Sequence, residues 1–335
     1  MDKNELRHSI FATAKREGSL KESVIKHAGD YGINDVEELL PQAKQLTPEF
    51  VNSDVEWVDK ILQKVHKSPF ARVKTLFLDI TAETLRAKGY IKGSEKVEHV
   101  FELIKRNTEP TTIYTKQKID RDDVIDVTDF PLVSWIKQEM ELKLNEELAR
   151  AILLGDGRVP GDPYKIDEEC IRPIVKDKDL YSVKVELPAD FKTNQDYTQF
   201  IKTVARNRKK YKGSGSPALF ASEDTIAELL LIEDSTGRLI YPTVEALKSA
   251  LRVSDIIAVP EMEGFIRETA DGKVHTVLGI IANLADYSLG ADKGGEKALF
   301  DDFDIDFNQM KYLIETRRSG ALVKPYSALI IENVE

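Results

Sequence analysis

The sequence predicts a mixed α+β fold with one large or two medium domains, and three observations favour it. The chain has 335 residues, of which 41% are hydrophobic and 32% charged, as in globular proteins that bury a core. Segments with apolar residues at helical spacing are interspersed with short runs rich in β-branched and aromatic residues. The chain contains no internal repeat.

The composition argues against several classes of protein. The formal net charge of −10 disfavours tight binding to a phosphate backbone, which needs a basic face. No apolar run approaches the ~20 residues that cross a bilayer. The N-terminus lacks the apolar core of a secretory signal, so we expect the chain to stay where it is made. The single cysteine, Cys170, cannot form an internal disulfide and fits a reducing cytoplasm.

The N-terminal part of the chain is predicted to hold short helices, two strands and a charged tip between the strands. Residues 1–52 contain amphipathic patterns too short to make a core alone, so we expect them to dock elsewhere. A helix follows from Asp54, and the run "FARVKTLFLDIT" predicts an outgoing strand. Residues 82–106 predict a helical turn and a second short helix, and "TTIYTKQKID" then predicts a returning strand.

The longest helix is predicted over residues 129–154. Thr128 or Asp129 can cap its start, and Gly155 fits the cap at its end. Its apolar residues repeat every four positions, and each such step advances about 40° beyond a full turn. The apolar stripe therefore slides around the helix, which predicts different neighbours along its length. The residues of this stripe are Leu132, Ile136, Met140, Leu144, Leu148 and Ile152.

The rest of the chain predicts further short helices and strands. A turn-rich segment over 155–174 precedes a helix over about 193–210, and "PALFAS" predicts a buried strand. Alternation on both sides of Ser319 and Gly320 predicts a β-hairpin with its turn at that pair.

No catalytic, cofactor-binding or metal site is predicted. The five histidines are scattered and none lies at metal-ligand spacing, so zinc and Cys–His nucleophile sites lack support. The run "DDFDIDFN" lacks the central glycine and distal glutamate of a calcium loop and is interpreted as an acidic strand. The basic run "RNRKKYK" is typical of a helix end that complements the helix dipole.

One acidic cluster leaves an enzymatic alternative open. Asp120, Asp122, Asp123 and Asp126 could hold Mg²⁺ for phosphoryl chemistry, as in a metal-dependent nuclease. A solvated or salt-bridging ribbon is the favoured interpretation, because charge runs usually lie on surface faces. The ribbon over 114–130 has a charge at nearly every other position and little core of its own, which indicates that it lies on another molecule.

Four stretches carry a further signal: "LFLDITAETLRAKGYIKG", "TTIYTKQKIDRDDVIDVTDF", "EELARAILLGDGR" and "ETRRSGALVKPYSALII". Together they resemble tailed-bacteriophage major capsid proteins of the Hong Kong 97 type, over about Ser53 to Val334. The resemblance implies a Hong Kong 97-like capsid fold of the α+β class. Its parts are an N-terminal arm, an extended loop, a peripheral domain with a long spine helix, and an axial domain.

The resemblance divides the chain into successive segments. They are an N-terminal arm or short scaffold-like region (1–52), a helix leading into the peripheral domain (53–71), the extended loop (72–124), the peripheral domain (125–216) with its spine helix (129–154), the axial domain (217–307) and the returning peripheral-domain strands (308–335). We expect the N-terminal region to stay attached.

The resemblance also implies a structural protein rather than an enzyme, with no cofactor and no membrane partner. Such a major capsid (head) protein self-assembles as hexamers and pentamers into an icosahedral shell. The shell encloses double-stranded phage DNA without sequence-specific binding, in a virion assembled in the bacterial host cytoplasm. A portal protein and a scaffold function are the implied partners. An encapsulin, the shell protein of a bacterial nanocompartment, is the alternative with the same fold, and the tip over 82–106 favours the phage protein.

The extended loop is expected to contact a neighbouring subunit. Its charged side chains could make exposed ion pairs, each worth well under about 1 kcal/mol but repeated at every contact. These residues are Lys88, Lys92, Lys116, Lys118, Asp120, Arg121, Asp122 and Asp123. Some relatives join subunits by a lysine–asparagine isopeptide bond, for which residue type alone makes candidates of Lys88, Lys92, Lys96 and Asn333. Ordinary surface lysines are the favoured interpretation.

Overall fold

The computed structural model describes residues 56–78, 103–121, 132–188, 191, 196–269, 272–291 and 297–334. The predictions for residues 1–52, 79–102 and 122–131 lie outside the described residues. The chain divides into two units. The larger consists of Asp54–Lys118 and Lys137–Glu335 and contains both sheets described below, and the smaller consists of Met1–Ser53 and Ile119–Ile136.

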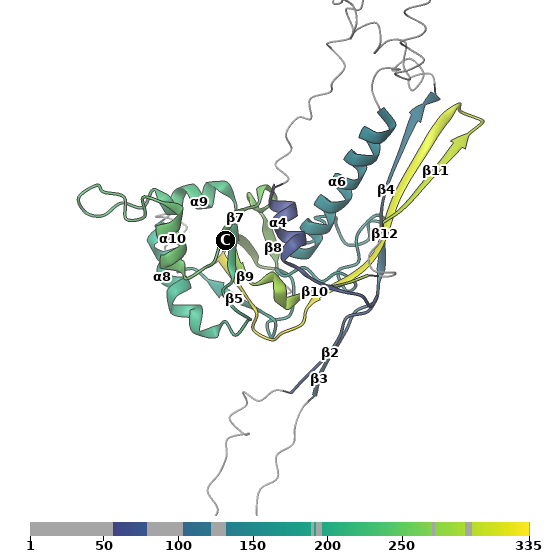
Figure 1. Ribbon diagram of the computed structural model, residues 1–335. Coiled ribbons are helices and arrows are strands. Elements are labelled where there is room, and N and C mark those ends of the chain that lie inside the picture. Colours follow the sequence, from purple (N-terminus) through teal and green to yellow (C-terminus); the bar gives the residue numbers. More distant parts are fainter. Residues whose placement is uncertain are drawn as a thin grey trace, which may run out of the picture. The chain divides into compact units, whose positions relative to one another are not determined.

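The first sheet has five strands arranged around a long strand, β12. Its order is β1-β10-β12-β11, and β4 also pairs with β12. Figure 1 shows β4 and β11 beside β12. Strand β1 runs parallel to β10, whereas β10 and β11 run antiparallel to β12. Among the strands that the structure describes, β11 pairs with β12 alone, which makes it an edge strand. The strands are β1 (His66–Ser68), β4 (Thr111–Asp120), β10 (Tyr287–Ala291), β11 (Ala298–Asp304) and β12 (Gln309–Leu322).

Helix α6 (Leu132–Leu153) confirms the long helix predicted from the sequence. Every member of its four-residue apolar repeat from Ile136 to Ile152 is buried. Gly155 ends the helix as predicted: its φ is +97°, in the left-handed region that favours glycine, and its N–H donates to the carbonyl of Arg150 at 3.0 Å.

Charged side chains join α6 to the β11–β12 hairpin. Lys137 pairs with Asp301 at 3.6 Å, and its ammonium lies 5.5 Å from the centre of the Tyr312 ring. One turn further along the helix, Glu141 pairs with Lys297. These contacts place the helix alongside the hairpin.

The second sheet has six strands in the order β5-β13-β9-β6-β7, with β8 paired to β9. Strand β13 lies between β5, to which it is parallel, and β9, to which it is antiparallel. The strands are β5 (Ser182–Glu186), β6 (Ala218–Ala221), β7 (Ile256–Ala258), β8 (Ile266–Glu268), β9 (Val274–Ala282) and β13 (Ala328–Val334). The sheet thus draws strands from three of the segments that the resemblance implies, and the division into those segments stays a prediction.

Three helices share the apolar core of the second sheet: α8 (Tyr197–Asn207), α9 (Glu223–Leu230) and α10 (Val244–Leu251). Each begins at a residue whose side-chain oxygen accepts a hydrogen bond from a backbone N–H of the first turn, as helix N-caps do: Asp196, Ser222 and Thr243. The predicted helix over about 193–210 and the predicted strand "PALFAS" are therefore confirmed as α8 and β6. Sheets of mixed direction packed with helices make an α+β fold.

The predicted hairpin at Ser319 and Gly320 is wrong. Strand β12 runs straight through this pair, and β13 belongs to the other sheet. Packing explains the pair instead. A Cβ on Gly320 would lie 2.6 Å from the hydroxyl oxygen of Tyr287, and the Ser319 hydroxyl donates to the carbonyl of Ala71 at 2.6 Å. The turn that pairs β12 with its neighbour lies earlier, between β11 and β12.

Gly320→Ala is expected to lower the melting temperature of the subunit. The added methyl must displace the fully buried Tyr287 ring, and overpacking of this kind costs about 1–3 kcal/mol. Thermal unfolding followed by circular dichroism measures the loss. Tyr287→Phe in the same background removes the nearest atom and should recover part of it. An unchanged melting temperature would contradict the packing explanation.

The predicted second short helix is wrong at its C-terminal end. Leu103–Asn107 forms strand β3, which pairs antiparallel with β2 (Lys74–Leu78). Residues 79–102, where the rest of that prediction falls, lie outside the described residues. Pairing with a strand distant in sequence overrides the weak local helical pattern.

Candidate assembly surfaces

The β2–β3 ribbon is fixed to the body of the larger unit at its base. Arg106, on β3, pairs with Asp177 at 2.6 Å, and their side chains are 4% and 1% exposed. The Arg106 guanidinium also lies 3.9 Å from the centre of the Tyr181 ring. Val73 and Thr108 hydrogen-bond to each other twice, at 3.1 and 3.2 Å. The buried pair and this double contact set where the two strands leave the core.

Strand β4 presents two of the predicted contact lysines to solvent. Lys116 and Lys118 are exposed on the same face of the strand as Tyr114, whereas Ile113 points inward and is buried. Neither lysine forms an ion pair with any of the described residues. The strand itself pairs with β12 of the same chain, so residues 114–120 of the predicted ribbon have one partner within their own chain, and the expectation that the ribbon lies on another molecule stays a prediction. That partner is distant in sequence, and local alternation could not indicate it.

The other predicted contact residues are only partly covered by the structure. Asp120 ends β4 and Arg121 follows it, and each has an interaction partner. Asn333, one isopeptide candidate, lies opposite Thr276 in the second sheet. The remaining predicted residues lie outside the described part of the chain: Lys88, Lys92, Lys96, Asp122, Asp123 and Asp126.

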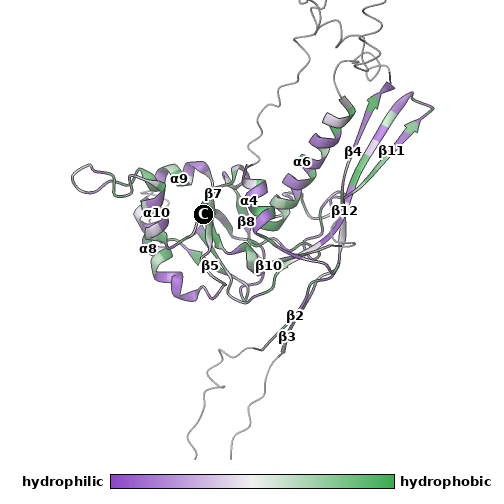
Figure 2. Ribbon diagram, in the orientation of Figure 1, coloured by the Kyte–Doolittle hydropathy of each residue, from purple (hydrophilic) through white to green (hydrophobic). Residues whose placement is uncertain are grey.

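An exposed apolar surface, which sequence reasoning missed, lies on the β11–β12 hairpin. We call it the hairpin patch, and Figure 2 shows hydrophobic and hydrophilic residues interspersed along this hairpin. Its large side chains are 37–83% exposed: Leu299, Phe300, Phe303, Ile305 and Phe307. An edge strand with exposed aromatic residues is a common site of contact between protein chains. The run "DDFDIDFN" indicated an acidic strand but not that its aromatic residues face solvent.

A second exposed apolar surface lies in the loop between α9 and α10. The loop is organised by Asp234, whose carboxylate accepts hydrogen bonds from the backbone of Thr236 and Arg238. Hydrogen bonds from Thr236 and from the Arg238 N–H lower the pKa of the Asp234 carboxyl. The exposed apolar residues on and beside this loop are Leu231, Leu239, Ile240 and Val244.

Two kinds of chemistry can be compared with the described residues: metal binding and a reactive thiol. They contain no group of three or more His, Cys, Asp or Glu side chains placed to hold a metal ion. Burial, together with the neighbouring Asp167 carboxylate, raises the pKa of the Cys170 thiol to about 11, which keeps it protonated at neutral pH and a poor nucleophile. Within the described residues no helix is long and apolar enough to span a bilayer.

Comparisons with solved structures identify the fold. The chain matches the structure titled "Capsid of native GTA particle computed with C5 symmetry" with a TM-score of 0.59 and 10% identity, over 83% of this chain and 91% of that one. It matches a structure from Mycobacterium phage Ogopogo with a TM-score of 0.56 and 12% identity, over 82% of this chain and 91% of that one. It also matches a virus-like particle from Pyrococcus furiosus with a TM-score of 0.50 and 13% identity, over 83% and 95%.

Sequence comparisons add nothing to this result, since no protein-family model and no curated protein matches the chain. The structural matches extend over more than four-fifths of the chain. The chain has the Hong Kong 97-like capsid fold that its sequence predicts.

Proposed function

We propose that this protein is the major capsid protein of a tailed phage, which self-assembles into an icosahedral shell around double-stranded DNA. The observation that carries the proposal is the capsid fold, shared over 83% of the chain with the capsid of the GTA particle. The exposed hairpin patch and the apolar α9–α10 loop support it. A subunit of a shell must keep apolar surface for its neighbours. We further propose hexamers and pentamers as the intermediate assemblies, and a virion assembled in the host cytoplasm with a portal protein and a scaffold function.

The acidic net charge is typical of a protein that encloses nucleic acid without binding it tightly, rather than of a nucleic-acid-binding protein. With a net charge of −10 the chain lacks the excess of cations that neutralises many phosphates. We propose that it carries no catalytic activity and holds its DNA by enclosure. The pairwise contacts between subunits then supply the stability of the particle.

Negative-stain electron microscopy of the purified protein tests the proposal. The expected result is closed shells or rings of capsomers, accompanied by fast-sedimenting species in analytical ultracentrifugation. Monomers alone at every concentration and salt condition tried, with the subunit folded by circular dichroism, would overturn it.

An encapsulin-type compartment is the second candidate, favoured by the match to the virus-like particle from Pyrococcus furiosus. The contents of shells isolated from their natural host distinguish the two. A phage head is expected to contain double-stranded DNA that resists nuclease until the shell is opened. A compartment is expected to contain a cargo protein instead.

Reversing the charge of Lys116 and Lys118 to glutamate is expected to weaken assembly more at low salt than at high salt. The two side chains are exposed and form no ion pair with the described residues, so their charges are available to a neighbouring subunit. Salt screens such exposed pairs within about 10 Å at 0.1 M. Light scattering at a series of salt concentrations measures assembly. The matched control reverses Lys209 and Lys210, exposed lysines after α8, and equal effects from the two pairs would contradict a specific role.

A further inference from the structure

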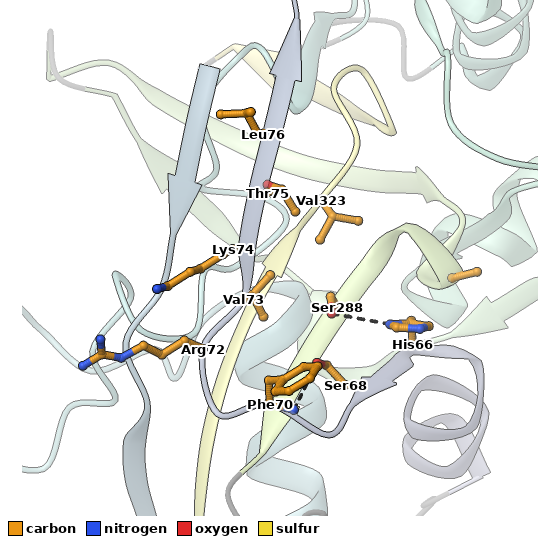
Figure 3. A pocket seen from close by; sticks show the side chains of 11 residues that line it. His66, Ser68, Phe70, Arg72, Val73, Lys74, Thr75, Leu76, Ser288 and Val323 are labelled. Atoms are coloured by element: carbon orange, nitrogen blue, oxygen red, sulfur yellow. Dashed lines mark hydrogen bonds between the residues drawn. The ribbon is translucent and has the colours of Figure 1, made fainter. Parts of the chain in front are cut away.

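A cavity of about 760 Å³ lies where the chain passes from β1 into β2. Figure 3 shows the lining side chains from His66 to Leu76 beside Ser288 and Val323. His66 and Ser288 both line the cavity, and the His66 Nδ1 atom lies 3.5 Å from the Ser288 hydroxyl oxygen. Two features of its rim decide what it can bind: the large apolar side chains are exposed, and the charged ones are all basic.

The apolar part of the rim consists of Phe70 and Leu76, which are 73% and 58% exposed. Val323 also lines the cavity. The charged part consists of Arg72 and Lys74, which alternate with buried Val73 along the strand. Among the described residues, no carboxylate lines the cavity. Among the described residues Lys74 has no ion pair, and Arg72 has only an exposed contact with Glu109 at 3.6 Å. The cavity therefore suits a ligand that is both apolar and acidic.

The tip of the β11–β12 hairpin has this composition. Ile305 and Phe307 are large apolar side chains and are 83% and 69% exposed. Four aspartates surround them, and two of these are already paired: Asp301 with Lys137 and Asp304 with Lys311. Asp302 and Asp306 are exposed and form no ion pair with the described residues.

The tip cannot reach the cavity of its own chain. Asp304 pairs with Gln309 at one end of β12, and Ser288, which lines the cavity, pairs with Ala321 near the other. At about 3.3 Å per residue, β12 holds these two positions about 40 Å apart. Any contact between the tip and the cavity therefore joins two copies of the chain.

We propose that the cavity beside Phe70 receives the β11–β12 hairpin tip of a second copy of this chain. Ile305 and Phe307 pack against the apolar rim, and Asp302 and Asp306 lie beside Arg72 and Lys74. The contact uses a different surface on each partner, so repetition of it generates rings or closed assemblies rather than isolated dimers. The inference rests on the proposed function, because it assumes that copies of the chain assemble. It specifies one contact between copies, which an experiment can disprove while the proposed function still holds.

Charge reversal with rescue tests the contact. Arg72→Glu with Lys74→Glu, and separately Asp302→Lys with Asp306→Lys, are each expected to abolish shell formation at low salt, because like charges then meet. The chain with all four substitutions restores opposite charges in every copy and is expected to recover shells. Lys209→Glu with Lys210→Glu, which changes the net charge as much as the Arg72 and Lys74 substitutions do but at another exposed pair, is expected to assemble normally. Thermal unfolding confirms that each variant folds.

Zero-length carbodiimide cross-linking of the wild-type protein provides a second test that no folding defect can affect. In a mixture of ¹⁵N-labelled and unlabelled protein, mass spectrometry is expected to find Lys74 joined to Asp302 or Asp306 of a differently labelled copy. Shell formation by both charge-reversed variants, or a four-substitution variant that stays unassembled, would overturn the contact. A wild-type protein that forms no shells would instead defeat the proposed function, and the cross-link in its soluble oligomers would still decide the contact.

Discussion

Asp177→Ala is expected to lower the free energy of unfolding of the subunit by about 3–5 kcal/mol, because it leaves the buried Arg106 guanidinium without its counter-charge. Two other guanidinium nitrogens of Arg106 already lack a hydrogen-bond partner among the described residues, so no alternative acceptor is at hand. Urea or guanidinium denaturation followed by circular dichroism measures the change.

The same ribbon supplies a matched control. Arg72 and Glu109 form an ion pair at 3.6 Å with side chains 53% and 67% exposed. Glu109→Ala is expected to cost less than about 1 kcal/mol, since solvent screens such a pair. Replacing both partners of the buried pair, Arg106→Met with Asp177→Leu, is expected to recover most of the lost stability. If Asp177→Ala proved no more costly than Glu109→Ala, the pair would not anchor the ribbon.

Replacing residues 79–102 with a short glycine–serine turn is expected to leave a folded, soluble subunit that forms no closed shells. The tip predicted over 82–106 ends inside β3, so the structure moves the end of the replaced segment to residue 102. Residues 103–110 include β3, Arg106 and Thr108, which contact the body of the larger unit. The shorter replacement leaves the β2–β3 pairing and the buried pair in place.

Circular dichroism and thermal melting check the fold of the shortened subunit, and negative-stain microscopy checks its assembly. Retained cooperative melting together with absent shells is the expected outcome. Loss of cooperative melting would place the replaced segment in the core. Normal shells would mean that the extended loop is not what joins the subunits.

The elements that the sequence predicts well are those whose own pattern decides their structure. The apolar residues from Ile136 to Ile152 recur every four positions, so the helix and its buried side follow from the local sequence. Gly155 ends the helix in the left-handed conformation, which costs glycine less free energy than other residues. The elements that it predicts wrongly depend on distant partners. Ser319 and Gly320 have the residue types of a turn, but the Tyr287 ring occupies the space that the glycine leaves.

The candidate surfaces follow the same rule. Alternation along β4 indicated that Lys116 and Lys118 face outward, and they do. It could not indicate that β12 of the same chain pairs with this strand. Phe300 and Phe303 resemble core residues in the sequence, because an aromatic residue on an edge strand has the same local pattern as one in a buried strand. Their exposure depends on what packs against the two faces of the hairpin, which the local pattern does not encode.

The position of β13 has a consequence for synthesis of the chain. It lies between β5 and β9 in the second sheet, although it follows both in the sequence by many residues. Until it has left the ribosome, β5 has no neighbour and β9 lacks one, so that sheet cannot close. Contacts between such distant segments form slowly. Before β13 is made, a nascent chain therefore leaves the edges of β5 and β9 unpaired, and unpaired edges of this kind make partly folded chains prone to aggregate.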